Sequence, residues 1–167
     1  MKKYVIMCML MVLLSGCSAG QRFETVSDAL QEPDAVVACQ ITADFPKDTA
    51  VPVFESPEDV TVYLCDGYDI VLCTLEAGDL DRTLKEITGF SKEKLTVLET
   101  KQNDFTRYDC VWSAAGEGGD QIGRAAVLDD GNYHYAMTVM ANSEDAGALQ
   151  AQWQPMFDSF QAVSTAP

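Results

Sequence analysis

The cysteines and the single histidine are the residues of this chain that could carry chemistry of their own. The sequence contains six cysteines, and His134 is its one histidine. A cysteine activated by a histidine is a nucleophile, cysteines and a histidine together can hold zinc, and paired cysteines of an exported protein form disulfides. The spacing of these residues, and the elements that would position them, discriminate among the three chemistries.

Cys17 lies at the end of a segment with the features of an export signal. Lys2 and Lys3 precede an uninterrupted run of 11 apolar residues over positions 4–14. That length fits the hydrophobic region of a signal peptide, whereas a membrane-spanning helix needs about 20 apolar residues. The run ends in LSGC at residues 14–17, which resembles the bacterial lipobox.

The lipobox resemblance implies that residues 1–16 are a cleaved signal peptide and that Cys17 becomes the acylated N-terminus. Two acyl chains give a stable anchor, so we expect the protein on the extracytoplasmic face of the cell membrane. Polar residues 18–34 would form a flexible tether. Ordinary cleavage after Gly20 and an uncleaved anchor are the alternatives.

Four cysteines remain once Cys8 is removed with the signal and Cys17 is acylated: Cys39, Cys65, Cys73 and Cys110. They contain no CxxC pair, which argues against a zinc ribbon or a thioredoxin-like site. An even number permits disulfides, and buried free thiols are the alternative. The candidate disulfide joins Cys110 to Cys73 or to Cys39, because Cys65 and Cys73 should point to opposite faces of a hairpin.

The charge balance excludes some partners. The net charge is −15, with 26 acidic residues. Such a surface repels nucleic acid and anionic lipid headgroups. We interpret the acidity as solubility outside the cell, with a cationic partner or loosely held Ca²⁺ as the alternative. We predict no cofactor and no metal site, because the acidic turn at residues 129–132 lacks the alternating ligands of a calcium loop.

The apolar pattern predicts strands, a helix, more strands and a last helix. Period-two alternation indicates a first strand over residues 37–45. Apolar runs flanking turn residues indicate hairpins of residues 60–65 with 68–75 around Asp66-Gly67, and of 104–114 with 121–129 around Gly116–Gly119. Single strands are expected at residues 95–101 and 132–141.

Two helices complete the predicted fold. Asp79 should cap a short helix that ends at Gly89. Ser143 should cap the last helix, in which Pro155 should cause a kink or a break. The fold class is therefore α+β, a largely antiparallel sheet of six to seven strands with two helices packed on it, over residues 35–161. Residues 162–167 are expected to form a disordered tail.

The expected hairpins also indicate whether Cys110 and His134 could form a catalytic pair. If the strands pair across Asp130-Gly131 and across Gly116–Gly119, His134 faces Val127, whereas Cys110 faces Ala125 one strand further over. The two side chains would then lie ~12 Å apart, using ~4.8 Å per strand and ~3.3 Å per residue. Nucleophilic catalysis needs about 3 Å, so no catalytic residue is predicted.

Two segments resemble the PsbP-like (Mog-type) domains found in many small bacterial lipoproteins. They are TGFSKEKLTVLET at residues 88–100 and SEDAGALQAQWQPMFDSFQ at residues 143–161. The resemblance implies a sheet-plus-helices domain that binds or scaffolds other proteins. It brings no catalytic motif, and the cysteines are not part of it.

The sequence therefore predicts a lipid-anchored binding or scaffold module with an envelope protein as its partner. Tyr63, Tyr68 and Tyr108 are the candidate partner-binding residues, if they form an exposed aromatic patch. Trp112 and Trp153 are expected to be core residues. A cell-envelope hydrolase using a carboxylate pair is the second hypothesis, and a small-ligand carrier is the third.

Overall fold

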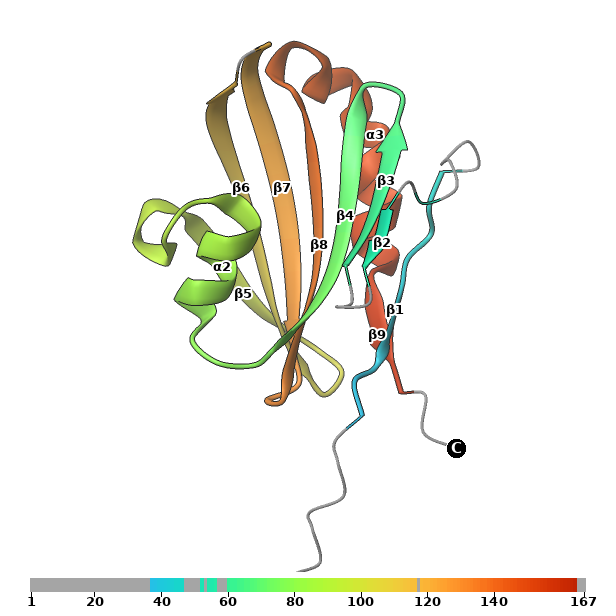
Figure 1. Cartoon of the computed structure of the whole chain (residues 1–167), viewed down its shortest axis with the longest axis vertical. Coiled ribbons are helices and arrows are strands. Elements are labelled where there is room, and N and C mark those ends of the chain that lie inside the picture. Colours follow the sequence, from blue (N-terminus) through green and yellow to red (C-terminus); the bar gives the residue numbers. More distant parts are fainter. Residues whose placement is uncertain (1–36, 47–51, 53, 57–59, 117, 165–167) are drawn as a thin grey trace, which may run out of the picture. The chain divides into compact units, whose positions relative to one another are not determined.

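The structure is a computed structural model that describes residues 37–46, 52, 54–56, 60–116 and 118–164. The expected signal peptide, acylated Cys17 and tether lie outside these residues. Within the described part the protein is α+β, with a large antiparallel sheet, a small two-stranded sheet and two α-helices (Figure 1). This confirms the predicted fold class.

The large sheet has seven strands. Every neighbouring pair is antiparallel. Along the sheet, the strands are β2 (Phe54–Ser56), β3 (Val60–Cys65), β4 (Tyr68–Glu76), β8 (Tyr133–Asn142), β7 (Gly119–Asp129), β6 (Phe105–Gly116) and β5 (Thr96–Gln102). The chain crosses from the centre of the sheet to its far edge between β4 and β5, and the first helix lies in that crossover.

Two tight hairpins have the predicted register. In the first, Cys65 pairs with Tyr68 across Asp66-Gly67, where Gly67 has a φ of 82° that favours glycine. In the second, β6 and β7 join at Gly116 and Gly119. Both turns were predictable because turn residues interrupt two long apolar patterns.

The register between β7 and β8 differs from the prediction. His134 pairs with Asp129 and not with Val127. The turn is centred on residues 131 and 132, one residue later than expected, because the Asp130 N–H donates to the Tyr133 carbonyl at 3.2 Å and two aspartates bind the turn backbone. The Asp129 carboxylate accepts a hydrogen bond from the N–H of residue 131, and the Asp130 carboxylate accepts from those of residues 132 and 133, at 2.6–2.7 Å. These side-chain hydrogen bonds hold the turn one residue further along the chain than the expected Asp130-Gly131 hairpin.

Helix α2 spans Leu80–Thr88 and is capped as predicted. The Asp79 carboxylate accepts a hydrogen bond from the Asp81 N–H at 3.1 Å, and Gly89 ends the helix in the left-handed conformation at φ 80°. A short 3₁₀ helix, η1 (Lys92–Lys94), then leads into β5. Leu84 is fully buried against the sheet, so α2 covers one of its faces.

Helix α3 spans Ser143–Ser159 without interruption, so Pro155 does not break it into two pieces. The helix begins one residue earlier than predicted, because Asn142 and not Ser143 occupies the capping position. Burial explains why the helix continues through the proline, since Met156 and Phe157 just beyond it are fully buried against the sheet. Packing therefore outweighs the hydrogen bond that proline cannot donate.

The sheet separates two hydrophobic cores. The α3-face core is the larger and contains mainly residues of β4, β7, β8 and α3. The α2-face core lies on the opposite side and contains Cys73, Leu84, Cys110, Trp112, Ala125, Val127 and Ala136. Trp153 belongs to the α3-face core and Trp112 to the α2-face core, and both are buried as expected.

The two chain ends of the described part form a small sheet that the sequence did not predict. Strand β1 (Gln40–Thr42) pairs with β9 (Gln161–Val163). The expected first strand is therefore shortened to three residues, and residues 162 and 163 belong to a strand, not to a disordered tail. The Tyr135 hydroxyl ties β1 to the large sheet, because it accepts from the Cys39 N–H at 2.9 Å and donates to the Asp130 carboxylate at 2.8 Å.

Candidate interaction groove

His134 takes part in a buried polar chain beneath α2. Its Nδ1 lies 2.7 Å from the Thr83 hydroxyl, and its Nε2 lies 3.7 Å from the Asp129 carboxylate. The order hydroxyl, imidazole and carboxylate has the look of a catalytic triad. However, Thr83 and His134 are only 2% and 1% exposed, so no substrate atom can reach the hydroxyl. The chain is a structural link between α2 and β8.

The structure does not form the predicted disulfides, since all four described cysteines are free. Cys73 on β4 and Cys110 on β6 share the α2-face core but lie three strands apart, a separation of about 14 Å. A disulfide needs Cβ atoms about 4 Å apart. Cys39 packs against the α3-face core, on the opposite side of the sheet from Cys110.

Burial also makes the two core thiols poor nucleophiles. It raises the pKa of Cys73 to about 11, with a smaller contribution from Glu86. It raises the pKa of Cys110 to about 11 as well, assisted by Asp109. Because the thiolate is the reactive form, these residues are inert at neutral pH.

The three candidate tyrosines do not form one patch. Tyr63 stacks on Phe45 with ring centroids 5.1 Å apart, and buried Tyr68 meets Trp153 edge to face at 6.2 Å. Both contact the α3-face core, whereas Tyr108 packs against the α2-face core. The prediction was wrong because the period-two alternation of strands places these residues on opposite faces.

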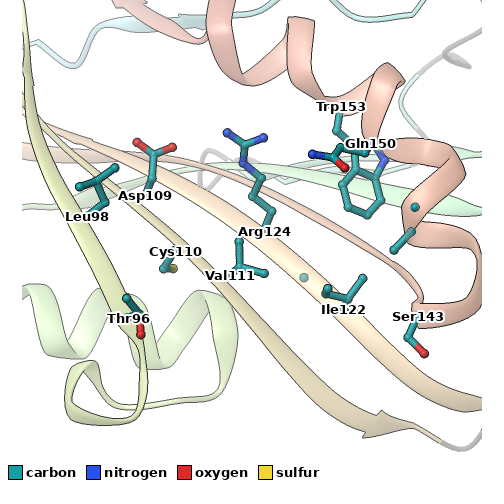
Figure 2. A pocket seen from close by; sticks show the side chains of 13 residues that line it. Thr96, Leu98, Asp109, Cys110, Val111, Ile122, Arg124, Ser143, Gln150 and Trp153 are labelled. Carbon is teal, nitrogen blue, oxygen red and sulfur yellow. The ribbon is translucent and has the colours of Figure 1, made fainter.

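An open apolar groove is the feature of the described surface best suited to binding. It lies on the α3 face between α3 and strands β5, β6 and β7, with a volume of about 680 Å³ (Figure 2). Leu98, Val111 and Ile122 line its sheet side, and Ala146 and Trp153 line its helix side. Leu98 and Val111 are 62% and 53% exposed, which is unusual for large apolar residues gathered in one hollow.

The groove exists because α3 does not cover the whole sheet. The helix packs on β7 and β8, while the same face of β5 and β6 extends beyond it. Apolar side chains that α3 does not reach are thus left to solvent. The sequence carried no signal for this surface, because Leu98 follows Val97 and Val111 stands between Cys110 and Trp112, so no alternation with polar neighbours marks either residue. The width of sheet that the helix covers is not a sequence pattern either.

A cation lies within the groove. The Arg124 guanidinium sits over the Phe157 ring at 4.0 Å and donates to the Gln154 side chain at 3.1 Å. The neighbouring Asp109 carboxylate is held by Arg107, with nitrogen–oxygen distances of 2.7 and 3.0 Å. Within the described residues Arg124 forms no salt bridge, although the carboxylates of Asp109 and Asp158 act on it from further away, so the groove offers a positive charge in a strongly acidic chain.

Burial lowers the pKa of Arg124, and the carboxylates of Asp109 and Asp158 oppose that shift. An arginine stays charged at any physiological pH, so the guanidinium remains a cation in the groove. A carboxylate on a bound partner could therefore accept a charge-assisted hydrogen bond from Arg124. Figure 2 shows the Arg124 side chain rising from the sheet between Asp109 and Gln150.

Nothing in the described geometry assembles a catalytic centre. The groove contains a single carboxylate, Asp109. A separate small hollow of about 260 Å³ near the chain ends of the described part is lined by Asp44 and Asp158. Both residues are exposed, whereas the acid of a glycosidase needs an apolar environment. The described residues hold no cluster of three or more metal-ligating side chains. They also contain no helix long and apolar enough to cross a membrane.

Comparison with known proteins gives limited sequence similarity. No family model matches the chain. The 4-hydroxy-tetrahydrodipicolinate reductase of Clostridium botulinum (strain Eklund 17B / Type B) is 29% identical over 104 residues, which are 56% of this chain and 39% of that enzyme. The chain thus spans well under half of the curated relative that it matches.

Comparison of structures gives the fold. The cyanobacterial PsbP protein of Synechocystis sp. PCC 6803 superposes with a TM-score of 0.52 at 12% identity, covering 78% of this chain and 95% of that protein. A protein of Bacteroides thetaiotaomicron VPI-5482 superposes with a TM-score of 0.51 at 10% identity, covering 75% of this chain and 46% of the other. The chain therefore has a PsbP-like fold, as its two resembling segments predicted.

Proposed function

We propose that the protein is a lipid-anchored, non-catalytic binding module on the extracytoplasmic face of the cell membrane. Its groove between α3 and strands β5–β7 accepts an apolar segment of an envelope protein. The exposure of Leu98 and Val111 within one hollow is the observation that carries this proposal. Acylation of Cys17 supplies the anchor.

The chemistry of the described residues supports binding over catalysis. The histidine and both core thiols are buried, and the groove contains one carboxylate that Arg107 already binds. The groove instead offers apolar side chains and the Arg124 cation among them. This combination is typical of sites that recognise a partner by burying a few large side chains and orienting them with a charge.

Cross-linking in living cells tests the proposal. A tagged wild-type protein is compared with Cys17→Ser, which removes the anchor, and with the double variant Leu98→Asp/Val111→Asp, which charges the groove. Leu64→Asp is the matched control, because Leu64 is also 50% exposed but lies on β3. We expect one dominant envelope partner for the wild type and for Leu64→Asp, and its loss in the other two.

Two results would contradict the proposal in different ways. If the groove variant still captured the partner, the binding site would have to lie elsewhere on the protein. A partner retained by Cys17→Ser at the same yield, together with a non-acylated Cys17 in the mass spectrum of the purified protein, would exclude the lipid anchor.

A further inference from the structure

Strand β6 continues past the end of its neighbour β5 and leaves part of its backbone without a strand partner. Strand β5 pairs with residues 105–111 of β6, and its first residue, Thr96, pairs with Val111. Residues 112–116 of β6 pair with β7 on one side. No strand of the described part lies on their other side. The sheet therefore has a notch, defined by residues 112–116 of β6 and by Thr96.

The direction of the backbone groups in the notch follows from the hairpin. A two-residue loop makes Gly116 and Gly119 a hydrogen-bonded pair, and such pairs recur at every second residue of an antiparallel ladder. Residues 114 and 112 then direct their N–H and C=O groups to β7. Ser113 and Ala115 direct theirs to the open side, where an incoming strand could pair with them.

Two hollows border the notch. The groove described above lies on the α3 face. A second hollow of about 380 Å³ lies at the open edge of the sheet and reaches both faces. It is lined by Phe90, Lys94, Leu95, Trp112 and Ser113, and it shares Thr96, Val111 and Ile122 with the groove. Phe90, Leu95 and Trp112 belong to the α2 face of the sheet. Successive side chains of a strand point to opposite faces, so one strand in the notch would place neighbouring side chains in the two hollows.

From this juxtaposition we infer that the notch accepts an extended segment of the partner as an added strand. The inference rests on the proposed function and names its mode of recognition. The segment carries two adjacent bulky apolar residues, one for each hollow, next to an acidic residue. Lys94 in the second hollow and Arg124 in the groove supply the complementary charge, whereas the chain as a whole carries −15. Backbone pairing would give affinity and the hollows would give specificity.

The outer edge of β5 is the competing site, and it is less suited. Its exposed residues beyond Leu98 are polar or charged and include Lys101, which is typical of an edge protected from strand addition. The second hollow is lined by Thr96 but by no later residue of β5.

Hydrogen exchange tests the inference on the full chain held in lipid nanodiscs. Random peptides displayed on phage are selected on the wild type and counter-selected on Leu98→Asp/Val111→Asp, and the best peptide is the probe. We expect selected peptides to share two adjacent bulky apolar residues and an acidic residue. Their binding should slow amide exchange in the segment 112–116, as measured by mass spectrometry.

A pair of variants at one position provides an independent readout. Ala115→Pro removes an N–H that faces the open side and is compatible with an edge, whereas Ala115→Thr keeps it. We expect Ala115→Pro to weaken peptide binding about tenfold, the loss of one to two backbone hydrogen bonds, and Ala115→Thr to leave it unchanged.

The outcomes separate this inference from the proposed function. Slowed exchange at residues 96–102 would show that the peptide adds to β5 and would contradict the inference that the notch accepts the strand. Binding that depends on Val111 without any slowed exchange in β6 would also overturn it, while leaving the groove as the binding site. Failure to select any peptide that distinguishes the wild type from the groove variant would contradict the proposed function itself.

Discussion

Cys73, Cys110 and His134 lie on the α2 side of the sheet, where burial removes them from reaction with solutes. The sequence was sufficient to separate Cys110 from His134, because hairpin turns fix which residues face each other. The observed register, with His134 opposite Asp129, places the two even further apart than predicted. The contact between Thr83 and His134 could not be predicted, because it depends on where α2 packs against β8 and not on either element alone.

The two core thiols should make the protein less stable in alkali. Both have a folded pKa of about 11 against an ordinary value of 9.0, so below pH 9 they are protonated in both states and their contribution is fully present. As the pH rises from 9 to 11 the unfolded chain loses these protons first, and the free energy of unfolding falls. Urea denaturation across this range should show a shallower fall for Cys73→Val/Cys110→Val than for the wild type. An identical pH dependence would contradict the burial of the thiols.

Gly123 should be intolerant of any side chain, because it pairs with Trp112 across β6 and β7. A Cβ at Gly123 would lie 2.3 Å from the indole ring, and the neighbouring core is closed. We expect Gly123→Ala to lower the free energy of unfolding by about 1–3 kcal/mol, as overpacking does. Gly118→Ala is the control, since nothing lies within 4 Å of its Cβ position. Equal urea midpoints for the two variants would refute the close contact.

At the scale of elements, long periodic segments were predicted well and short strands were not. Strands β3 to β8 and both helices carry apolar periodicity or turn residues that can be recognised locally. Strands β2 and β9 have three residues each, too few to show a period, and β1 is only the three-residue middle of the strand predicted over residues 37–45. Strands β1 and β9 exist through pairing with each other across the described chain, and β2 through pairing with its neighbour β3. The continuity of α3 through Pro155 has the same origin, since the burial of Met156 and Phe157 is tertiary.

The link between α2 and β8 should contribute to stability and not to function. Thr83→Val removes the hydroxyl that bonds the buried His134 Nδ1 and leaves that nitrogen without this partner. We expect a loss of about 1–3 kcal/mol in the free energy of unfolding, with unchanged partner cross-linking. Thr83→Ser, which retains the hydroxyl, should recover much of the loss. If Thr83→Val instead abolished an activity of the folded protein, the polar chain would have to be reconsidered as a catalytic group.

At the scale of the whole molecule, the proposed function depends on the part of the sheet that α3 leaves uncovered. The sequence predicted an exposed docking surface but assigned it to three tyrosines, because aromatic residues are common at interfaces. The apolar surface lies instead over β5 and β6, because the sheet is wider than the single helix that packs on this face. Which strands the helix covers depends on the packing of the whole core, so this part of the candidate site could not be predicted from the sequence.

Site-specific photocross-linking in living cells tests the central claim most directly. A photoreactive benzoylphenylalanine is placed at position 98 in the groove or at position 64 on β3, two positions that are 62% and 50% exposed as leucines. A binding groove predicts one discrete cross-linked envelope protein from position 98, none from position 64, and loss of that product when Val111→Asp is added. Equal products from both positions, or no product from position 98, would contradict the assignment of the groove as the binding site.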